Sequence, residues 1–187
     1  MQLYALCDQD VLDKFNISIE YFVSIANEHD AKIIQYRNKT ADIAFIKKQL
    51  IKIRKLYNGF LIVNDKYELI EFCDGVHLGQ EDLREIDLDI FKAIEKVRDV
   101  ITKDKILGIS THNEVEILES NKMDLNYIGL GAYRSTSTKN NISVVLGKEL
   151  DALAFKSKHP VCAIGGVKLS DDFENVTYNV ICTGLLK

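Results

Sequence analysis

Short apolar runs alternate with amphipathic runs along the whole chain, and no other feature constrains the fold as much. The apolar runs are only a few residues long, as expected for strands buried on both faces of a sheet. The amphipathic runs repeat apolar residues every three or four positions, for example at Ile46, Leu50 and Ile53, which is the spacing of one helix face. Repeated strand–helix alternation predicts parallel strands joined by right-handed crossovers.

The pattern predicts eight strands and the segments that connect them. The predicted strands are Tyr4–Cys7, Lys32–Lys39, Phe60–Asp65, Gly75–Gln80, Ile106–Thr111, Tyr127–Gly131, Val161–Gly165 and Val180–Thr183. The predicted helices are Ile17–His29, Ala41–Tyr57, Tyr67–Phe72, Asp89–Ile101, Val115–Asn121 and Leu150–Lys156. Eight such units favour a closed α/β barrel of the (β/α)8 (TIM) type, with an open doubly wound sheet as the alternative. No G-x-G-x-x-G motif opens the first helix, which argues against the open sheet.

The predicted barrel is trimmed at its C-terminal end. Its seventh helix, Asp171–Asn175, amounts to at most one turn, and the eighth is missing because the chain stops four residues after Thr183. The 187 residues suit a single domain but are few for this barrel, which typically has about 250. Because a bare strip of barrel wall would expose apolar surface, we expect a homo-oligomer in which another subunit covers strand eight.

Composition excludes several classes of protein. The net charge of −4 does not indicate the basic patch that a nucleic-acid-binding protein needs. No apolar run approaches the roughly 20 residues of a membrane span, and no signal peptide precedes Tyr4. The four cysteines form no C-x-x-C pair, which argues against zinc and fits a reducing cytoplasm.

Chemistry in such barrels lies at the C-terminal ends of the strands, so polar residues there are candidates. Gln35, Arg37 and Lys39 fall on one face at the end of strand two. The guanidinium and the ammonium would suit a multiply charged anion such as pyrophosphate. A solvated strand end with a salt bridge is an equal alternative.

Two carboxylates, Asp65 and Asp82, follow strands three and four. One or two carboxylates together with substrate phosphates are the usual ligands of Mg²⁺. Asn64 and His77 would line the adjoining floor. Taken singly, Asp82 could instead cap a helix, and His77 could be a hydrogen-bonded core histidine.

Strand five carries Ser110 and His112 on one face. His112 could act as an acid or base, or could cap the following helix. Strand six is followed by a hydroxyl-rich loop that contains Thr136, Thr138 and Lys139, which could bind a phosphate. Strand seven ends in paired glycines, and Gly166 there would let a phosphate approach the backbone.

The order of these motifs resembles the thiamine phosphate synthase family from Tyr4 to about Gly166, and the segment Gly75–Asp82 is its most specific part. The resemblance implies a (β/α)8 transferase that couples hydroxymethylpyrimidine pyrophosphate with thiazole phosphate. It would release pyrophosphate in a Mg²⁺-assisted dissociative displacement and form thiamine phosphate.

The resemblance also implies a role for each candidate residue. The catalytic residues that would hold the pyrophosphate are Arg37, Lys39 and Lys139. The Mg²⁺ ligands would be Asp65 and Asp82. The substrate-binding residues would be Gln35, Asn64 and His77 for the pyrimidine, Ser110 for the thiazole, and Thr136, Thr138 and Gly166 for the thiazole phosphate.

Some positions depart from the family pattern. Ala132 replaces a proline, Arg134 adds a charge near the phosphate site, and Cys182 or Thr183 stands near a family serine. One alternative is a related thiazole tautomerase that would use His112 as acid/base, although that group generally lacks the Asn-Asp and Gln-Glu-Asp motifs retained here. The other alternative is a non-catalytic paralogue that binds a thiamine precursor.

Overall fold

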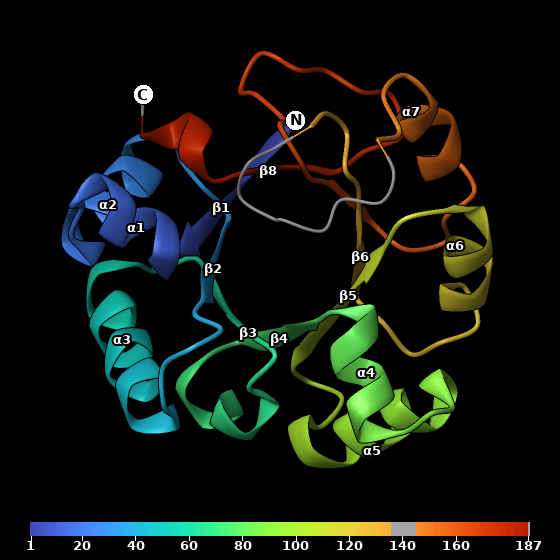
Figure 1. Cartoon of the computed structure of the whole chain (residues 1–187), viewed down its shortest axis with the longest axis horizontal. Helices are drawn as coiled ribbons and strands as arrows, with labels where there is room; N and C mark the ends of the chain where they lie inside the picture. The colour runs from blue at the N-terminus through green and yellow to red at the C-terminus, as the bar shows by residue number, and fades with distance from the viewer. Residues whose placement is uncertain (136–144, 187) are drawn as a thin grey trace.

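Eight parallel strands form a closed barrel in the computed structural model, which describes residues 1–135 and 145–186 (Figure 1). The strands follow one another around the barrel in chain order, and β8 pairs with β1 to close it. Their bounds are β1 Gln2–Asp8, β2 Ile33–Arg37, β3 Phe60–Asn64, β4 Gly75–Leu78, β5 Ile106–Thr111, β6 Tyr127–Leu130, β7 Val161–Ala163 and β8 Tyr178–Ile181. The closed barrel is confirmed, and the open sheet is excluded.

Helices surround the barrel (Figure 1). The α-helices are α1 Gln9–Phe15, α2 Ile19–Glu28, α3 Ile43–Leu56, α4 Gln80–Ile86, α5 Ile90–Ile101, α6 Glu114–Ser120 and α7 Glu149–Ala154. Two short 3-10 helices are η1 Tyr67–Phe72 and η2 Thr183–Leu185. The sequence pattern did not predict α1 and α4. No helix in the described part of the chain is long and apolar enough to cross a membrane.

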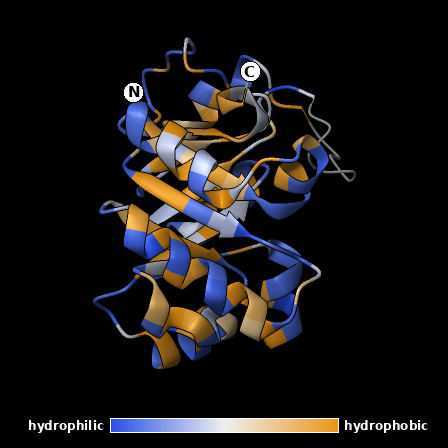
Figure 2. Ribbon diagram, turned by 90° about the vertical axis from the view of Figure 1, so that its left-hand side faces the viewer, coloured by the Kyte–Doolittle hydropathy of each residue, from blue (hydrophilic) through white to orange (hydrophobic). Residues whose placement is uncertain are grey.

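Local sequence explains where the main helices begin. Side chains of Ser18, Asp42, Asp89 and Asn113 each accept a hydrogen bond from a backbone N–H of the first turn that follows. Such N-caps satisfy donors that a helix leaves unpaired at its start. Figure 2 shows polar and hydrophobic residues alternating around the helices, as amphipathic helices on a barrel require.

The strands bury side chains on both of their faces. Outward-facing residues such as Ile34, Val63 and Leu107 pack with the helices in the main core. Inward-facing residues fill the barrel itself, and the buried members of this second cluster are Tyr4, Leu6, Ile33, Ile62, Tyr127, Cys162 and Val180. The barrel is therefore a packed core below its functional end.

Strand eight is covered by the chain's own residues. No helix follows β8 among the described residues, apart from the short η2. However, outward-facing Ile181 is buried in the same core as Leu185 of η2 and Val167 and Val176 of the preceding loop. The bare apolar strip that motivated a covering subunit is not observed, because these segments take the place of the eighth helix.

Candidate active site

Lys39 lies between two carboxylates beyond the ends of neighbouring strands. Its Nζ is 2.6 Å from Asp65 Oδ2 and 3.0 Å from Asp82 Oδ1. Asp65 follows β3 in a left-handed conformation, with φ of 62°. Asp82 lies in the first turn of α4, whose N-cap is Gly79, so the alternative of Asp82 as the cap is wrong. The structure thus brings Lys39, expected at an anion site with Gln35 and Arg37, together with the carboxylate pair that the sequence analysis expected to meet.

Burial and the contacts among these three groups shift the pKa of each of them. Burial raises the pKa of Asp65 above its usual value, and the hydrogen bond from Lys39 offsets this only in part. Burial also acts to raise the pKa of Asp82, but the hydrogen bond and charge of Lys39 outweigh it and lower that pKa. Burial acts to lower the pKa of Lys39, yet its contacts with Asp65 and Asp82 raise it. The ammonium is therefore stabilised in its charged form.

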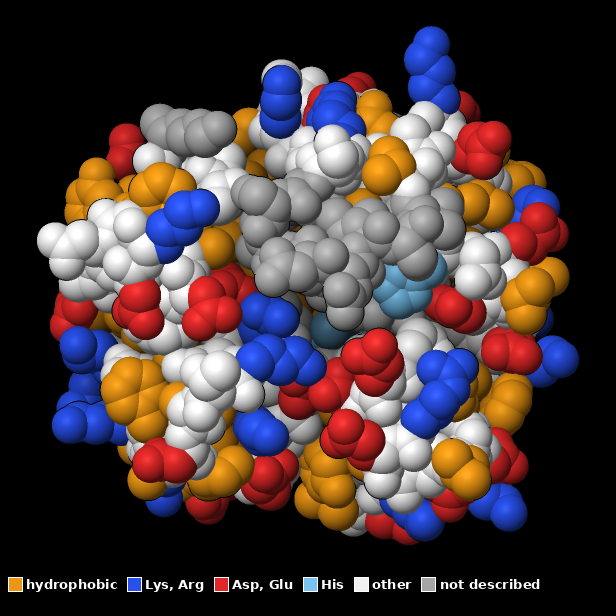
Figure 3. All heavy atoms as spheres, viewed as in Figure 1, with side chains coloured by type: hydrophobic (Ala, Val, Ile, Leu, Met, Phe, Trp, Pro, Cys, Tyr) orange, Lys and Arg blue, Asp and Glu red, His pale blue; other side chains and the backbone are white. Residues whose placement is uncertain are grey.

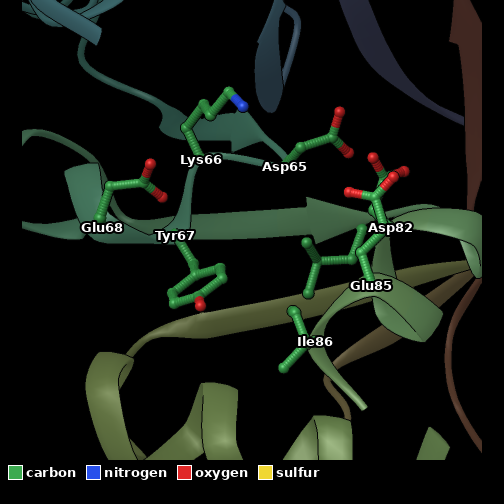
Figure 4. Close-up of a pocket in the computed structure, with 8 residues that line it drawn as sticks. Asp65, Lys66, Tyr67, Glu68, Asp82, Glu85 and Ile86 are labelled. Carbon is green, nitrogen blue, oxygen red and sulfur yellow. The ribbon is translucent and has the colours of Figure 1, made fainter. Parts of the chain in front are cut away.

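The two carboxylates fit a hard divalent cation. Their oxygens already converge on one positive charge, the Lys39 ammonium. Figure 4 shows both carboxylates at one side of a pocket of about 410 Å³, which lies between η1 and α4. Among the described residues, no three His, Cys, Asp or Glu side chains gather as a metal site. A Mg²⁺ held by Asp65 and Asp82 would therefore take its remaining ligands from substrate phosphates and water.

Arg37 is paired with a residue that the sequence analysis did not single out. Asp8 and Arg37 are register partners at the ends of β1 and β2, and Arg37 Nη1 donates to Asp8 Oδ2. Asp8 also accepts a hydrogen bond from Val11 N at the start of α1. A salt bridge is thus present at the end of strand two, but it is largely buried rather than solvated. Figure 3 shows acidic and basic side chains side by side near the middle of this face, close to histidine.

Amide side chains lie at the top of the barrel interior. Gln35 and Asn64 are both buried. Asn64 Nδ2 has no hydrogen-bond partner within the described part of the chain, and neither has Gln80 Oε1. Gln80 Nε2 donates to the backbone oxygen of Ser110 at 2.7 Å. Buried polar atoms rarely stay unpaired, so both are candidate contacts for a bound molecule.

His77 belongs to a hydrogen-bonded chain inside the barrel. Its Nδ1 is 2.9 Å from Tyr127 Oη, and its Nε2 is 3.0 Å from Ser110 Oγ. Tyr127 Oη is also 2.9 Å from Tyr4 Oη. The hydrogen-bonded series therefore runs from Tyr4 through Tyr127 and His77 to Ser110. Burial raises the pKa of both tyrosines well above the ordinary value, so their hydroxyls stay protonated. The sequence analysis grouped His77 and Ser110 as site residues but missed both tyrosines.

His112 pairs with Glu116. Its Nδ1 and its backbone nitrogen lie 3.0 Å and 2.8 Å from Glu116 Oε2. Asn113, not His112, caps α6, so the capping alternative is wrong. Burial acts to raise the pKa of Glu116, but the hydrogen bonds and charge of His112, together with a hydrogen bond from Asn113, outweigh it and lower that pKa. The His112 side chain is 38% exposed and remains open to a substrate.

The expected phosphate site is described only in part. Thr136, Thr138 and Lys139 lie outside the described residues. Gly166, with φ of 66°, has the left-handed conformation that favours glycine. Arg134 reaches Gly166 O at 2.9 Å, and its two terminal nitrogens contact the Asp171 carboxylate at 2.5 and 2.8 Å. The extra charge at Arg134 is therefore neutralised by a partner from the loop after β7.

Comparison with known proteins supports the resemblance. The family model described as thiamine monophosphate synthase matches residues 3–180. A thiamine-phosphate synthase from Lawsonia intracellularis is 35% identical over 98% of this chain and 82% of its own length. One from Dictyoglomus turgidum is 33% identical over 98% and 80%.

A solved structure agrees with these relatives. The thiamine phosphate pyrophosphorylase from Pyrococcus furiosus superposes with a TM-score of 0.77 at 26% identity. The match covers 97% of this chain and 85% of the other. With a family match over most of its length and relatives above 30% identity, this chain belongs to the thiamine monophosphate synthase family.

Proposed function

We propose that this chain is a thiamine phosphate synthase, a transferase that joins hydroxymethylpyrimidine pyrophosphate to thiazole phosphate and releases pyrophosphate. The main support is that Lys39, Asp65 and Asp82 meet beyond the C-terminal ends of the barrel strands in a chain of this family. A polyanion that leaves during the reaction needs positive charge and a metal site at one place.

Charged residues would act on the leaving pyrophosphate. Asp65 and Asp82 would hold Mg²⁺, which when bound would neutralise negative charge that develops on the leaving group. Arg37 and Lys39 would contact the pyrophosphate oxygens, with Lys139 assisting. Since the pair with Asp8 fixes the Arg37 guanidinium, that charge is oriented before the substrate binds.

Uncharged residues would hold the two rings in line. Gln35, Asn64 and His77 would contact the pyrimidine, and Asn64 Nδ2, which has no partner among the described residues, is a donor suited to a ring nitrogen. Ser110 would lie near the thiazole. The phosphate of the thiazole would be bound by Thr136, Thr138 and Gly166. No protein nucleophile is required, because the thiazole nitrogen would capture the pyrimidine cation left by pyrophosphate.

The thiazole tautomerase reaction is a second candidate. The half-exposed His112, oriented by Glu116, could accept and return a proton at Nε2. The retained carboxylate pair favours the synthase, because a tautomerisation releases no pyrophosphate and needs no metal to stabilise one. A third candidate is a binding protein without turnover.

Incubation with both substrates and Mg²⁺, followed by detection of thiamine phosphate, tests the proposal. We expect product in the wild type, none with EDTA, and at least a hundredfold loss in Asp65→Asn and Asp82→Asn. Glu68→Gln is the matched control, because Glu68 lines the same pocket outside the carboxylate pair. A folded wild type without product would reject the synthase, and active Asp65→Asn and Asp82→Asn variants would reject the metal assignment.

The proposal extends to a single catalytic domain over residues 1–187, a cytoplasmic location and a homo-oligomer. Light scattering at micromolar concentration tests the homo-oligomer, and a strict monomer would contradict it.

A further inference from the structure

The hydrogen-bonded chain of Tyr4, Tyr127, His77 and Ser110 has a defined direction. Tyr4 Oη has one hydrogen-bond partner among the described residues, Tyr127 Oη. Tyr4 is 2% exposed, so water is not a ready acceptor for its proton. A buried hydroxyl proton without an acceptor is costly, whereas a hydroxyl oxygen that accepts nothing costs less. Tyr4 must therefore donate to Tyr127.

The donation from Tyr4 sets the rest of the chain. Tyr127 is also buried, so its own hydroxyl proton needs an acceptor, and its other neighbour among the described residues is His77 Nδ1. Nδ1 then accepts and carries no proton. The neutral imidazole must hold its proton on Nε2, which lies 3.0 Å from Ser110 Oγ. Nε2 donates to this oxygen, which leaves the Ser110 proton free to point elsewhere.

We infer that Tyr127, oriented by Tyr4, is a positioning residue that fixes His77 as the Nε2–H tautomer and makes the Ser110 hydroxyl a donor to an acceptor atom on the substrate. A proton on Nδ1, alone or together with one on Nε2, would leave one of the two tyrosine hydroxyl protons without an acceptor among the described residues. The role of Ser110 toward substrate rests on the proposed function, but the tautomer does not.

Nuclear magnetic resonance of the ligand-free protein with ¹⁵N-labelled histidine tests the tautomer directly. Long-range ¹H–¹⁵N correlations distinguish a protonated from an unprotonated ring nitrogen, and His77→Gln identifies the signals of His77. We expect an Nε2–H tautomer in the wild type. An Nδ1–H tautomer or an imidazolium at neutral pH would overturn the inference, whether or not the protein has activity.

Tyr4→Phe and Tyr127→Phe each delete one buried hydroxyl. A comparison of the two separates an effect on the His77 tautomer from an effect on stability. In Tyr4→Phe, Tyr127 still donates to Nδ1, so the Nε2–H tautomer persists. In Tyr127→Phe, Nδ1 loses its donor and the preference for Nε2–H weakens, so we expect a mixture of the two neutral tautomers. An unchanged tautomer in folded Tyr127→Phe would contradict the inference. If that variant fails to fold, the spectra of the wild type and Tyr4→Phe still decide.

Kinetics test the consequence for the substrate. We expect Tyr127→Phe and Ser110→Ala each to lower kcat/KM about tenfold, and the double variant to be no worse than Ser110→Ala, because both remove the same donor. Additive losses would contradict the role of Ser110. A wild type with the expected tautomer but no thiamine phosphate formation would reject the proposed function and leave the tautomer assignment standing.

Discussion

The guanidinium of Arg37 donates to the carboxylate of Asp8, its register partner on the neighbouring strand. Asp8 is 2% exposed and the Arg37 side chain 16%, so the pair is largely withdrawn from water. The second oxygen of Asp8 caps α1 through Val11 N. One carboxylate thus fixes a cation of the active site and starts the helix that follows β1.

Substitution of Asp8 should separate these two roles. Asp8→Asn keeps a side-chain acceptor for the cap but leaves Arg37 buried without a counter-charge, a change that typically costs about 3–5 kcal/mol. Asp8→Ala removes the cap as well, and should cost about 1 kcal/mol more. Urea unfolding measures both. Equal stability of Asp8→Asn and the wild type would show that the pair contributes nothing to the fold.

Removal of Lys39 should make the protein depend on a divalent cation. In Lys39→Met, Asp65 and Asp82 face each other without the ammonium between them. Mg²⁺ should then stabilise the variant more than the wild type, and the stabilisation of the variant should reach about 2.7 kcal/mol at a concentration near 100 times its Kd. Thermal unfolding with Mg²⁺ and with EDTA measures this. Lys66→Met, in the same pocket, is the control, and identical Mg²⁺ responses in Lys39→Met and the wild type would argue against the site.

The barrel could be predicted from the sequence because its strands and longer helices have clear periodicities. The helices α1 and α4 could not be predicted, since each has only seven residues and buries few side chains. Those are Val11 and Leu12 in α1 and Leu83 in α4. One or two buried positions produce no repeating apolar stripe. The covering of strand eight was also missed, because it depends on loop residues that have no periodic pattern.

Strand ends indicated which residues meet at the site, but not their individual partners. Lys39, Asp65 and Asp82 come together because neighbouring parallel strands end at one edge. The contact between Tyr4 and Tyr127 joins residues 123 positions apart across the barrel interior. Such a contact depends on the stagger of all the strands, which local sequence does not encode.

The pair of Arg134 and Asp171 should make stability depend on acid pH. Hydrogen bonds from Arg134 lower the pKa of Asp171 below its unfolded value, so the pair stabilises the fold above the unfolded pKa. This contribution disappears as the pH falls through the folded pKa. Asp171→Asn should therefore be less stable than the wild type near pH 7, and the difference should shrink as the pH falls below the unfolded pKa, about 3.9, and through the lower folded pKa.

Urea unfolding at a series of pH values measures this difference. Asp172→Asn is the control, because Asp172 is exposed and is the immediate neighbour of Asp171. A difference between Asp171→Asn and the wild type that stays constant down to pH 2.5 would show that the effect does not come from the ionised carboxylate.

Glycine at position 108 makes room for the Tyr127 ring, its register partner on β6. A Cβ at Gly108 would lie 2.1 Å from Tyr127 Cζ, so Gly108→Ala should displace the ring and cost about 1–3 kcal/mol. At Gly129 the nearest atom to such a Cβ is His77 Cε1 at 3.2 Å, so Gly129→Ala should cost less. Urea unfolding ranks the two. If Gly129→Ala were less stable than Gly108→Ala, the space needed by the Tyr127 ring would not explain the glycine at position 108. Backbone flexibility would then be the explanation.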